Sequence, residues 1–544
     1  MGSIEIVLAM ALAVVVSGYL VRVLPVSFPL PIVQIALGGV ITGVFHHGVT
    51  LNPEVFFLLF LPPLLFLDGW QIPKDGLFRD KAQILHLSLG LVFFTVVVAG
   101  FLIHWLIPAM PLAVAFALAA ILSPTDPVAV SAIAARAPVP KRLMHILEGE
   151  SLLNDASGLV SFQFALAAAI TGVFSLKDAT LTFLWVALAG LACGVVFTLA
   201  VAALLQFVTR RFGEESGASI LVNLLIPFGA YLLAERIHAS GILAAVAAGI
   251  TMSYVEMTGR SLATTRLTRS AVWDTIQFTL NGIIFVLLGE QLPGIVQGAI
   301  TTVTQIGHRS PWWLIVYAIA ITAILALLRF AWVWLSVRLN RSWQRHYKQH
   351  AINPSNRLIA AMSLAGVRGS VTLAGILTLP LLLPDGSPFP ARNVAIFLAA
   401  VVILLSLSAA SIGLPRLLKD LKLPTEPDRH QEEDDARQAG AKAALESVRK
   451  LLASLPEQSA ADEVDLYADA ASRVLANYQK RVANTTSDSR DAAAQLRKAD
   501  AFERRLRLAG LQSERETFLS LARQRRISDH TLRRLVREVD LMES

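Results

Sequence analysis

The chain is 544 residues long, and 55% of its residues are hydrophobic while only 16% are charged. A mean hydropathy of +0.59 with so few charges excludes an ordinary soluble protein, in which about 25% of residues are charged. The formal net charge of +7 fits Lys and Arg residues that face anionic membrane lipid, so no nucleic-acid partner is needed to explain it.

Apolar segments of roughly 20 residues, each long enough to cross a bilayer as a helix, recur from the N-terminus to about Ser411. We predict an all-α, polytopic membrane protein with about 13 transmembrane helices. They cover residues 4–24, 27–45, 53–71, 82–107, 112–135, 143–173, 178–209, 217–235, 240–257, 272–298, 312–337, 356–383 and 391–415. The first segment follows Met-Gly-Ser-Ile-Glu, which lacks Lys and Arg, so we expect a span and not a signal peptide.

Basic residues gather in every second loop, which sets the orientation of the chain in the membrane. The basic loops contain Lys74, Arg79, Lys81, Arg136, Lys141, Arg142, Arg210, Arg211, Arg260, Arg266, Arg269, Arg338, Arg341, Arg345, Lys348 and Arg357. The loops between them hold little beyond Lys177, Arg236, Arg309 and Arg392. We therefore expect a multi-pass protein of a bacterial inner (plasma) membrane, with its N-terminus outside and its C-terminus in the cytoplasm.

The sequence lacks the patterns of common enzymes. Its single cysteine, Cys193, lies in an apolar segment and excludes an intrachain disulfide. The histidines show no metal-ligand spacing, and the pair His46-His47 falls in a predicted external loop. We find no nucleophile–base pair and no phosphate-binding loop. The prediction is a protein that is not an enzyme and that needs no cofactor besides an ion it transports.

Composition changes sharply after Pro415, where a charged segment rich in Ala, Glu, Arg and Gln begins. We predict a membrane domain over 1–415, a linker over 416–430 and a small helical cytoplasmic domain, regulatory in role, over 431–544. Apolar residues recur at helical spacing within the last region, and Ser528 is a candidate N-cap for a final helix. A partly disordered charged tail is the alternative.

Two apolar segments contain breaks near their middles. The fifth carries Pro124 and Pro127 within Ser-Pro-Thr-Asp-Pro, and the twelfth carries Gly366-Val-Arg-Gly-Ser370. Interrupted helices at corresponding positions of two halves indicate the binding site of a transporter. Six spans, a linking span and six more place these two breaks in equivalent positions of inverted repeats, so we expect discontinuous helices that cross each other.

Ionisable and polar residues lie near the bilayer midplane beside these breaks. The fifth segment contributes Thr125 and Asp126, and the sixth contributes Glu150, Ser151, Asn154 and Asp155. A carboxylate at the midplane costs about 2.5–3.5 kcal/mol on insertion scales, so its default interpretation is functional. Carboxylate, hydroxyl and amide oxygens on one helix suit a hard cation such as sodium. An aspartate that holds either a proton or a metal ion couples two opposite fluxes.

Other charged residues of the spans have weaker signals. Arg368 in the twelfth segment is the expected partner of Glu150 in a structural salt bridge. Asp68 lies at the cytoplasmic end of the third segment, where a functional role and an interfacial position are equally supported. Glu235 and Glu290 lie near the external ends of their segments, and we expect solvent contact for both.

Six stretches together resemble the bacterial sodium/proton antiporters of the monovalent cation/proton antiporter family, on the branch shared with animal sodium/proton exchangers. They read LFLPPLLFLDGW, AAILSPTDPVAV, LEGESLLNDASGLV, AERIHASGILAAVAAGI, NGIIFVLLGEQLP and GVRGSVTLAG, in this order along nearly the whole membrane domain. The tail matches only loosely. Glu290 stands where many relatives have an apolar residue.

The resemblance implies a set of roles and an assembly. It assigns ion binding to Asp155, Asn154, Ser151, Asp126 and Thr125, with sodium held by Asp155, Ser151 and Thr125. The structural pair falls on Glu150 and Arg368, and the cytoplasmic funnel on Asp68. It also implies a homodimer, a core domain that moves against a dimerisation domain, and electroneutral exchange, which is associated with Asn at position 154.

We therefore expect a secondary-active antiporter that exchanges sodium and protons by alternating access. Potassium or lithium are alternative cations, because ligand types alone do not separate them. A channel is a second alternative, and two discontinuous spans at a closed midplane argue against it. A membrane ion or pH sensor that signals through the tail is a third.

Overall fold

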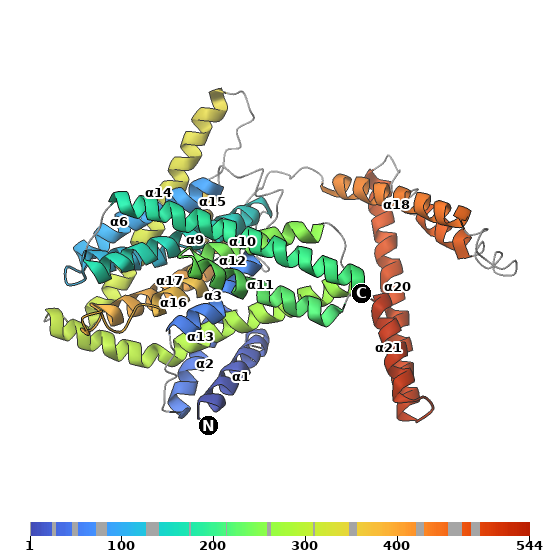
Figure 1. Cartoon of the computed structure of the whole chain (residues 1–544), viewed down its shortest axis with the longest axis horizontal. Coiled ribbons are helices and arrows are strands. Elements are labelled where there is room, and N and C mark those ends of the chain that lie inside the picture. The colour runs from blue at the N-terminus through green and yellow to red at the C-terminus, as the bar shows by residue number, and fades with distance from the viewer. Residues whose placement is uncertain are drawn as a thin grey trace. The chain divides into compact units, whose positions relative to one another are not determined.

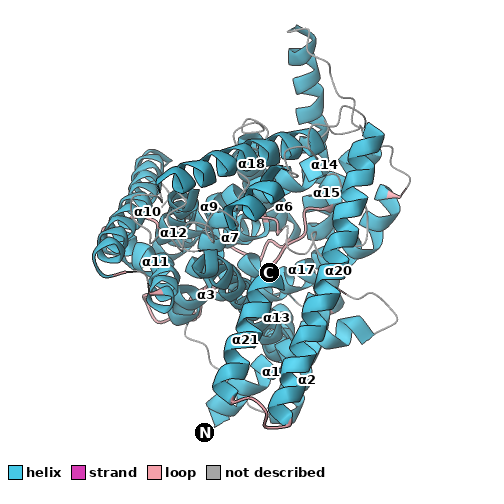
Figure 2. Cartoon of the chain, turned by 90° about the vertical axis from the view of Figure 1, so that its right-hand side faces the viewer, coloured by secondary structure: helices cyan, strands magenta, loops and turns pink. Residues whose placement is uncertain are grey.

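The computed structural model describes residues 2–23, 29–45, 53–71, 84–126, 141–172, 176–213, 215–257, 263–307, 310–346, 356–419, 429–454, 470–479 and 490–543. Within these ranges the protein is almost entirely helical, and only one isolated β-bridge, between Leu382 and Pro388, forms (Figure 2). The chain divides into two compact units, Met1–Lys422 and Leu423–Ser544. The division falls inside the predicted linker.

The helices of the first unit follow one another along the chain (Figure 1). Those of its first half are α1 (Gly2–Val23), α2 (Leu30–Phe45), α3 (Pro53–Gln71), the π-helix η1 (His86–Gly90), α6 (Leu91–Leu106), α7 (Leu112–Leu122) and α9 (Lys141–Thr171). Those of its second half are α10 (Leu176–Phe212), α11 (Ser216–Arg236), α12 (Gly241–Met257), α13 (Ala263–Gly307), α14 (Trp312–His346), α15 (Asn356–Leu364), α16 (Ser370–Leu377) and α17 (Arg392–Leu418).

Each predicted span coincides with a helix or a pair of helices in the described part of the chain. Eight helices there are long and apolar enough to cross a membrane, and four shorter apolar helices accompany them. Helices satisfy all backbone hydrogen bonds within one segment, which is why apolar runs of this length adopt them in lipid. The all-α membrane fold is confirmed, while the total of 13 crossings stays a prediction.

The helices form two groups, which also contact each other through α13 against α17 and through α16 against α3 and α13. In the scaffold bundle, α12 packs on α3, α10 and α11, and α2 packs on α1 and α13. In the crossover bundle, α7 packs on α6 and α9, and α17 packs on α14, α15 and α16, with η1 against α9. In the predicted repeats, α2 corresponds to α12 and α3 corresponds to α13. The symmetry would therefore convert the pair α3–α12 into the pair α13–α2, and both pairs pack together. The repeats themselves stay a prediction.

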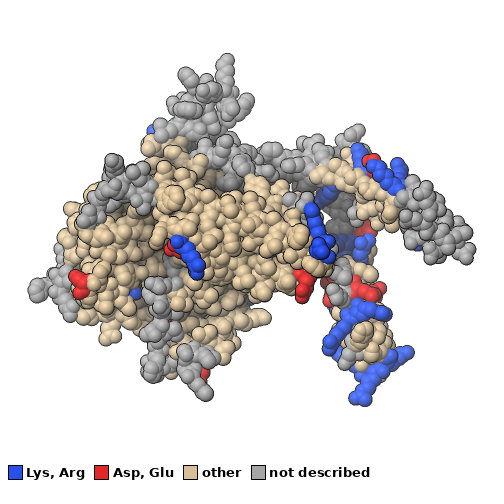
Figure 3. Space-filling view, in the orientation of Figure 1, with Lys and Arg blue, Asp and Glu red and all other residues tan. Residues whose placement is uncertain are grey.

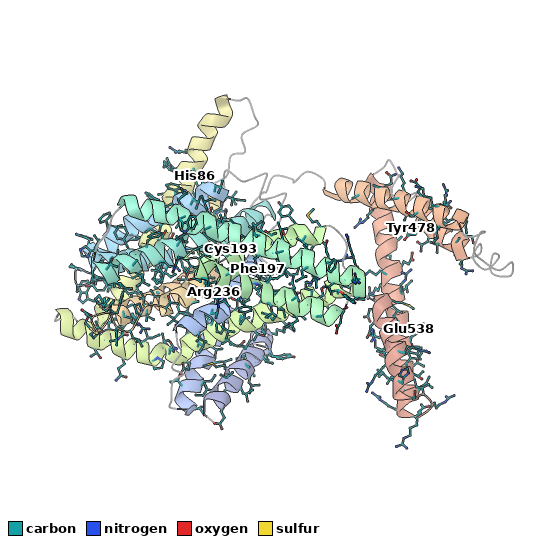
Figure 4. The ribbon with its side chains drawn as sticks, viewed as in Figure 1. His86, Cys193, Phe197, Arg236, Tyr478 and Glu538 are labelled. Atoms are coloured by element: carbon teal, nitrogen blue, oxygen red, sulfur yellow. The ribbon has the colours of Figure 1, made fainter. Side chains whose placement is uncertain are left out.

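Glycines allow the scaffold helices to approach closely. A Cβ on Gly249 of α12 would lie 2.0 Å from the carbonyl oxygen of Phe66 on α3, and one on Gly289 of α13 would lie 1.9 Å from that of Ile35 on α2. Small residues at such crossings are how membrane helices gain van der Waals contact. The lone cysteine, Cys193, lies on α10 one turn before Phe197 (Figure 4), and both pack against the cluster around Trp273.

Both predicted breaks are present. Helix α7 ends at Leu122, and residues 123–126 continue without helical structure, while Pro127 lies outside the described residues. Helices α15 and α16 are separated by residues 365–369. At both breaks, backbone groups within the crossover bundle lie outside the helical hydrogen-bond pattern.

The second unit contains α18 (Arg429–Ser454), a helix over 470–479, α20 (Arg490–Arg523) and α21 (Asp529–Glu543). Helix α21 packs on α20, and Arg515 forms ion pairs with Asp540 and Glu543. The hydroxyl of Ser528 accepts the Thr531 N–H at 3.2 Å, which confirms the predicted N-cap. Helix α17 of the first unit continues past residue 415, the predicted end of the membrane domain, to Leu418.

Charge separates the two units clearly. The face of the first unit in Figure 3 is almost free of charged side chains, whereas Lys and Arg gather on the helices of the second unit. The scarcity of charge on this face of the first unit fits contact with lipid, and the charged helices of the second unit fit contact with water.

Candidate functional site

The two interrupted segments meet through their backbones. The N–H of Asp126 donates a hydrogen bond to the carbonyl oxygen of Val367 at 2.7 Å. Gly369 lies so close that a Cβ there would stand 1.7 Å from Oδ2 of Asp126. The need for glycine at position 369 comes from this lack of space. It does not come from backbone conformation, because the backbone there is extended, with φ −128°, and any residue adopts that conformation.

Opposite charges lie at the two half-helix ends of this crossing. Asp126 stands against Gly369, the N-cap of α16, where the helix dipole and unpaired N–H groups favour an anion. The Arg368 guanidinium donates from Nε to the carbonyl oxygen of Leu122, at the end of α7, at 3.0 Å. It also donates from Nη1 to that of Gly366 at 2.5 Å. A cation at a helix C-terminus satisfies orphan carbonyls.

Helix α9 brings four predicted residues to this crossing. Glu150, Ser151, Asn154 and Asp155 are all buried. The Asn154 amide donates to the Thr125 hydroxyl at 3.0 Å, and that hydroxyl donates to Oε1 of Glu150 at 3.4 Å. The chain of hydrogen bonds fixes the non-helical turn after α7 against α9.

The structure corrects the predicted salt bridge. Glu150 pairs with Arg329 of α14, not with Arg368, and the pair is bidentate, at 2.5 Å and 2.8 Å. Arg329 is 3% exposed and also donates from Nε to the carbonyl oxygen of Met362. The prediction with Arg368 was wrong because that guanidinium is held at the end of α7. A single Arg inside the apolar span 312–337 was the overlooked signal.

Three carboxylates converge at the crossing. Asp155 is 5% exposed, and the charges of Asp68 on α3 and Asp126 both act on it. Asp68 and Asp126 also interact with each other, and Asp68 is partly exposed. The predicted funnel residue is thus part of the same cluster, contributed by the scaffold bundle.

Two buried oxygen atoms at the crossing have no hydrogen-bond partner, Oδ1 of Asn154 and Oγ of Ser123. Ser123 was not predicted, although it begins the same Ser-Pro-Thr-Asp stretch. Among the described residues, no group of three or more His, Cys, Asp or Glu side chains has the arrangement of a resident metal centre.

Two other acidic residues test the sequence interpretation. Glu235 is exposed, as predicted, and accepts the Gly241 N–H at 3.2 Å. Glu290 is 2% exposed, so the prediction of solvent contact was wrong. Helix α13 continues to Gly307, well past the predicted end at residue 298, which leaves Glu290 inside the helix and packed beside α2.

Comparison with known proteins gives one consistent result. Residues 10–420 match the family described as sodium/hydrogen exchanger, transmembrane. An uncharacterized Na+/H+ exchanger of Escherichia coli, YjcE, is 41% identical over 99% of this chain and 98% of its own length. A sodium, potassium, lithium and rubidium/H+ antiporter of Bacillus subtilis is 39% identical over 97% of this chain and 75% of its own.

The solved structure of the sodium proton antiporter NhaP1 from Methanocaldococcus jannaschii has a TM-score of 0.57 with this chain at 18% sequence identity. The match covers 77% of this chain and 99% of the archaeal one, and it shows a shared fold. With the family match over most of the chain and the many apolar helices, the protein is a multi-pass membrane protein that belongs to the sodium/hydrogen exchanger family.

Proposed function

We propose that this protein is a secondary-active antiporter that exchanges cytoplasmic sodium for external protons, with Asp155 holding one or the other in turn. The observation that carries the proposal is the position of Asp155. It is buried at the crossing, and the neighbouring charges that act on it are those of Asp68 and Asp126. A buried carboxylate beside two others is stable only when a proton or a cation neutralises it.

Oxygen atoms suitable for sodium lie on the same two segments, α9 and the turn after α7. The proposed ligands are the Asp155 carboxylate and the hydroxyls of Ser151 and Thr125, with the free Oδ1 of Asn154 nearby on the same helix. Hard cations prefer oxygen ligands of these kinds. Since a proton and sodium compete for the same carboxylate, binding of one releases the other.

The neighbouring charges support a one-for-one, electroneutral exchange. Glu150 is neutralised by Arg329, and Asp126 lies at the positive end of α16. Asn154 is neutral and is engaged with Thr125. Asp155 is then the carboxylate that alternates between a proton and one monovalent cation, so a full cycle moves no net charge.

Alternating access of a homodimer is the proposed transport mode. The crossover bundle carries Asp155 and Asp126, whereas the scaffold bundle carries Asp68, so relative motion of the two bundles would change the side to which the site opens. The basic loops favour an N-terminus outside and a C-terminus in the cytoplasm of a bacterial inner membrane, with anionic lipid against the basic rim.

Potassium, with lithium, is the rival cation, and one finding favours it. The Bacillus subtilis relative is named as an antiporter of sodium, potassium, lithium and rubidium. Cavity size and flexibility decide between these ions, and the present ligand set accepts each of them.

Proteoliposomes that contain the purified protein test the proposal. Addition of sodium should drive proton flux, and Asp155→Asn should abolish it while the protein stays folded. Asp385→Asn is the matched control. The Ser387 hydroxyl and N–H both donate to Asp385, which holds the pKa of that exposed carboxyl below its usual value. Asp385 is thus an ionised, exposed carboxylate in the loop after α16 and outside the described crossing, and its variant should keep full flux.

Parallel runs with potassium and lithium rank the cations. Flux like that of the unmodified protein in Asp155→Asn would remove Asp155 from the mechanism. Flux driven by potassium but not by sodium would replace the sodium proposal with its rival.

A further inference from the structure

One hydrogen bond joins the two helix bundles at the crossing. The hydroxyl of Ser370, the first residue of α16, donates to Oδ1 of Asn281 on α13 at 2.8 Å. Helix α13 belongs to the scaffold bundle, while α16 belongs to the crossover bundle and packs against α13, α3, α17 and α7. The bond therefore spans the boundary across which the two bundles face each other.

Ser370 is buried and Asn281 is half-buried, so water has little access to the bond between them. Asn281 stands within the apolar window Thr264–Thr302 of α13, between Leu280 and Gly282. Ser370 is 4% exposed and directly follows Gly369, which packs on Asp126. A polar group inside a membrane protein that loses its partner must find another one there.

Two other buried hydrogen bonds of asparagine side chains each stay within one bundle. In the scaffold bundle, Trp273 donates to Oδ1 of Asn223 at 2.7 Å. In the crossover bundle, Asn154 donates to Thr125 at 3.0 Å. A rigid motion of one bundle against the other preserves these two bonds. It breaks the bond between Ser370 and Asn281, because those residues are carried by different bundles.

We infer that the Ser370–Asn281 hydrogen bond is a latch that favours the conformation of this structure over the other access state, with Asn281 as a positioning residue for α16. The inference rests on the proposed alternating-access function. Removal of the bond should change the ratio of the two states about 3-fold on average and about 20-fold at most, the range that hydrogen bonds between membrane helices support.

The test measures the population of each state directly. Spin labels at Leu188 on α10 and Phe101 on α6, both exposed, report the distance between the bundles in lipid nanodiscs. Replacement of the single cysteine by Cys193→Ser provides the background. Asn281→Ala and Ser370→Ala should shift the distance populations by the same factor and in the same direction, and the double variant should shift them no further.

Two controls separate a latch from a merely structural contact. Asn223→Ala removes the buried hydrogen bond between Trp273 and Asn223 inside the scaffold bundle. It should therefore lower thermal stability and leave the distance populations unchanged. Ser370→Thr keeps the hydroxyl, so this variant should show the same distance populations as the unmodified protein. In flux assays the Ala variants should change the apparent sodium KM and kcat by different factors, because only the access equilibrium moves.

Populations that neither Ala variant changes, or shifts that simply add in the double variant, would overturn the latch. A single distance that sodium, pH and every variant leave in place would overturn it as well. The proposed function fails by a different result, the absence of sodium-driven or potassium-driven proton flux in the unmodified protein. The distance populations still decide the latch in that case.

Discussion

At the scale of single residues, the buried pair Glu150–Arg329 joins two helices at the crossing. Its two parallel hydrogen bonds tie α9 to α14, and Thr125 adds a third contact to the same carboxylate. Buried pairs of this kind add little stability over an apolar replacement, yet the loss of one member leaves a buried charge unpaired. The pair therefore constrains the geometry of α9, on which Asp155 stands one turn further along.

Glu150→Gln should destabilise the protein by roughly 3–5 kcal/mol, because Arg329 keeps its charge in a buried position without a counter-ion. The double variant Glu150→Leu with Arg329→Met should recover part of that loss. Thermal unfolding of the purified protein in detergent measures each variant. Glu150 with Arg368 forms the comparison cycle, and we expect a smaller coupling there, since Arg368 donates to the carbonyl oxygens of Leu122 and Gly366. Losses that are strictly additive for Glu150 and Arg329 would contradict the assignment.

The sequence predicted which residue types gather at the site, but not every contact among them. The positions of the polar residues of α9 and of the Thr-Asp pair after α7 within apolar segments predicted that they belong to the site. The partner of Glu150 was not, because Arg329 lies 179 positions away and only the packing of α14 against the crossover bundle brings it there. Two arginines of similar depth, Arg329 and Arg368, cannot be told apart without that packing.

At the scale of elements, the site depends on two helices that stop inside the membrane region. Each interruption exposes backbone groups that need partners. Asp126 supplies an anion to the start of α16, and Arg368 supplies a donor to the end of α7. The interruption is thus stabilised by residues of the other interrupted segment, which is why the two breaks occur together.

Gly369→Ala should abolish transport and lower the yield of folded protein. The new Cβ would overlap the Asp126 carboxylate, and the neighbouring backbone, held by the hydrogen bond from Asp126 to Val367, leaves little room for adjustment. Gly294→Ala is the matched control, since a Cβ there meets nothing within 4 Å and Ala favours a helix interior. Expression, size-exclusion profile and flux compare the two. Normal flux in Gly369→Ala would show that Asp126 does not need this close contact.

Element positions were largely predictable, and the exceptions have physical causes. Apolar runs and broken midpoints identified the helices and both interruptions, since lipid requires long helices. Helix ends were less accurate because polar residues can continue a helix beyond the apolar core, as α13 does to Gly307. Glu290 is buried because α13 packs beside α2 at that point, which the sequence does not show.

At the scale of the whole molecule, the second unit is the part whose role the sequence leaves most open. The match with the Escherichia coli relative covers 99% of this chain, so it includes this unit, which the sequence motifs had matched only loosely. Its helices carry many Arg residues, among them Arg504, Arg505 and Arg507 on α20. Basic residues near a cytoplasmic membrane face gain about 1 kcal/mol each from anionic lipid, an attraction that salt weakens.

Truncation after Pro427 should shift the pH dependence of flux while the maximal rate is retained. The described residues of the second unit contain no helix long and apolar enough to cross a membrane, and we expect the unit to tune the flux. Flux measured against pH in proteoliposomes, at low and high salt, tests this. An unchanged profile would assign the unit a structural role such as support of the dimer, and total loss of transport in a well-folded dimer would contradict both interpretations.

The account as a whole depends on one carboxylate, Asp155, that holds a proton and a cation in turn. The most direct test is the apparent KM for sodium of the unmodified protein in proteoliposomes, measured from about pH 8.5 down to about pH 6. A buried carboxylate can gain or lose its proton within this pH range. Competition predicts that the constant rises as pH falls and approaches about a tenfold rise per pH unit once the site is mostly protonated. A sodium constant that stays the same across this window, in protein that still exchanges sodium for protons, would contradict the account.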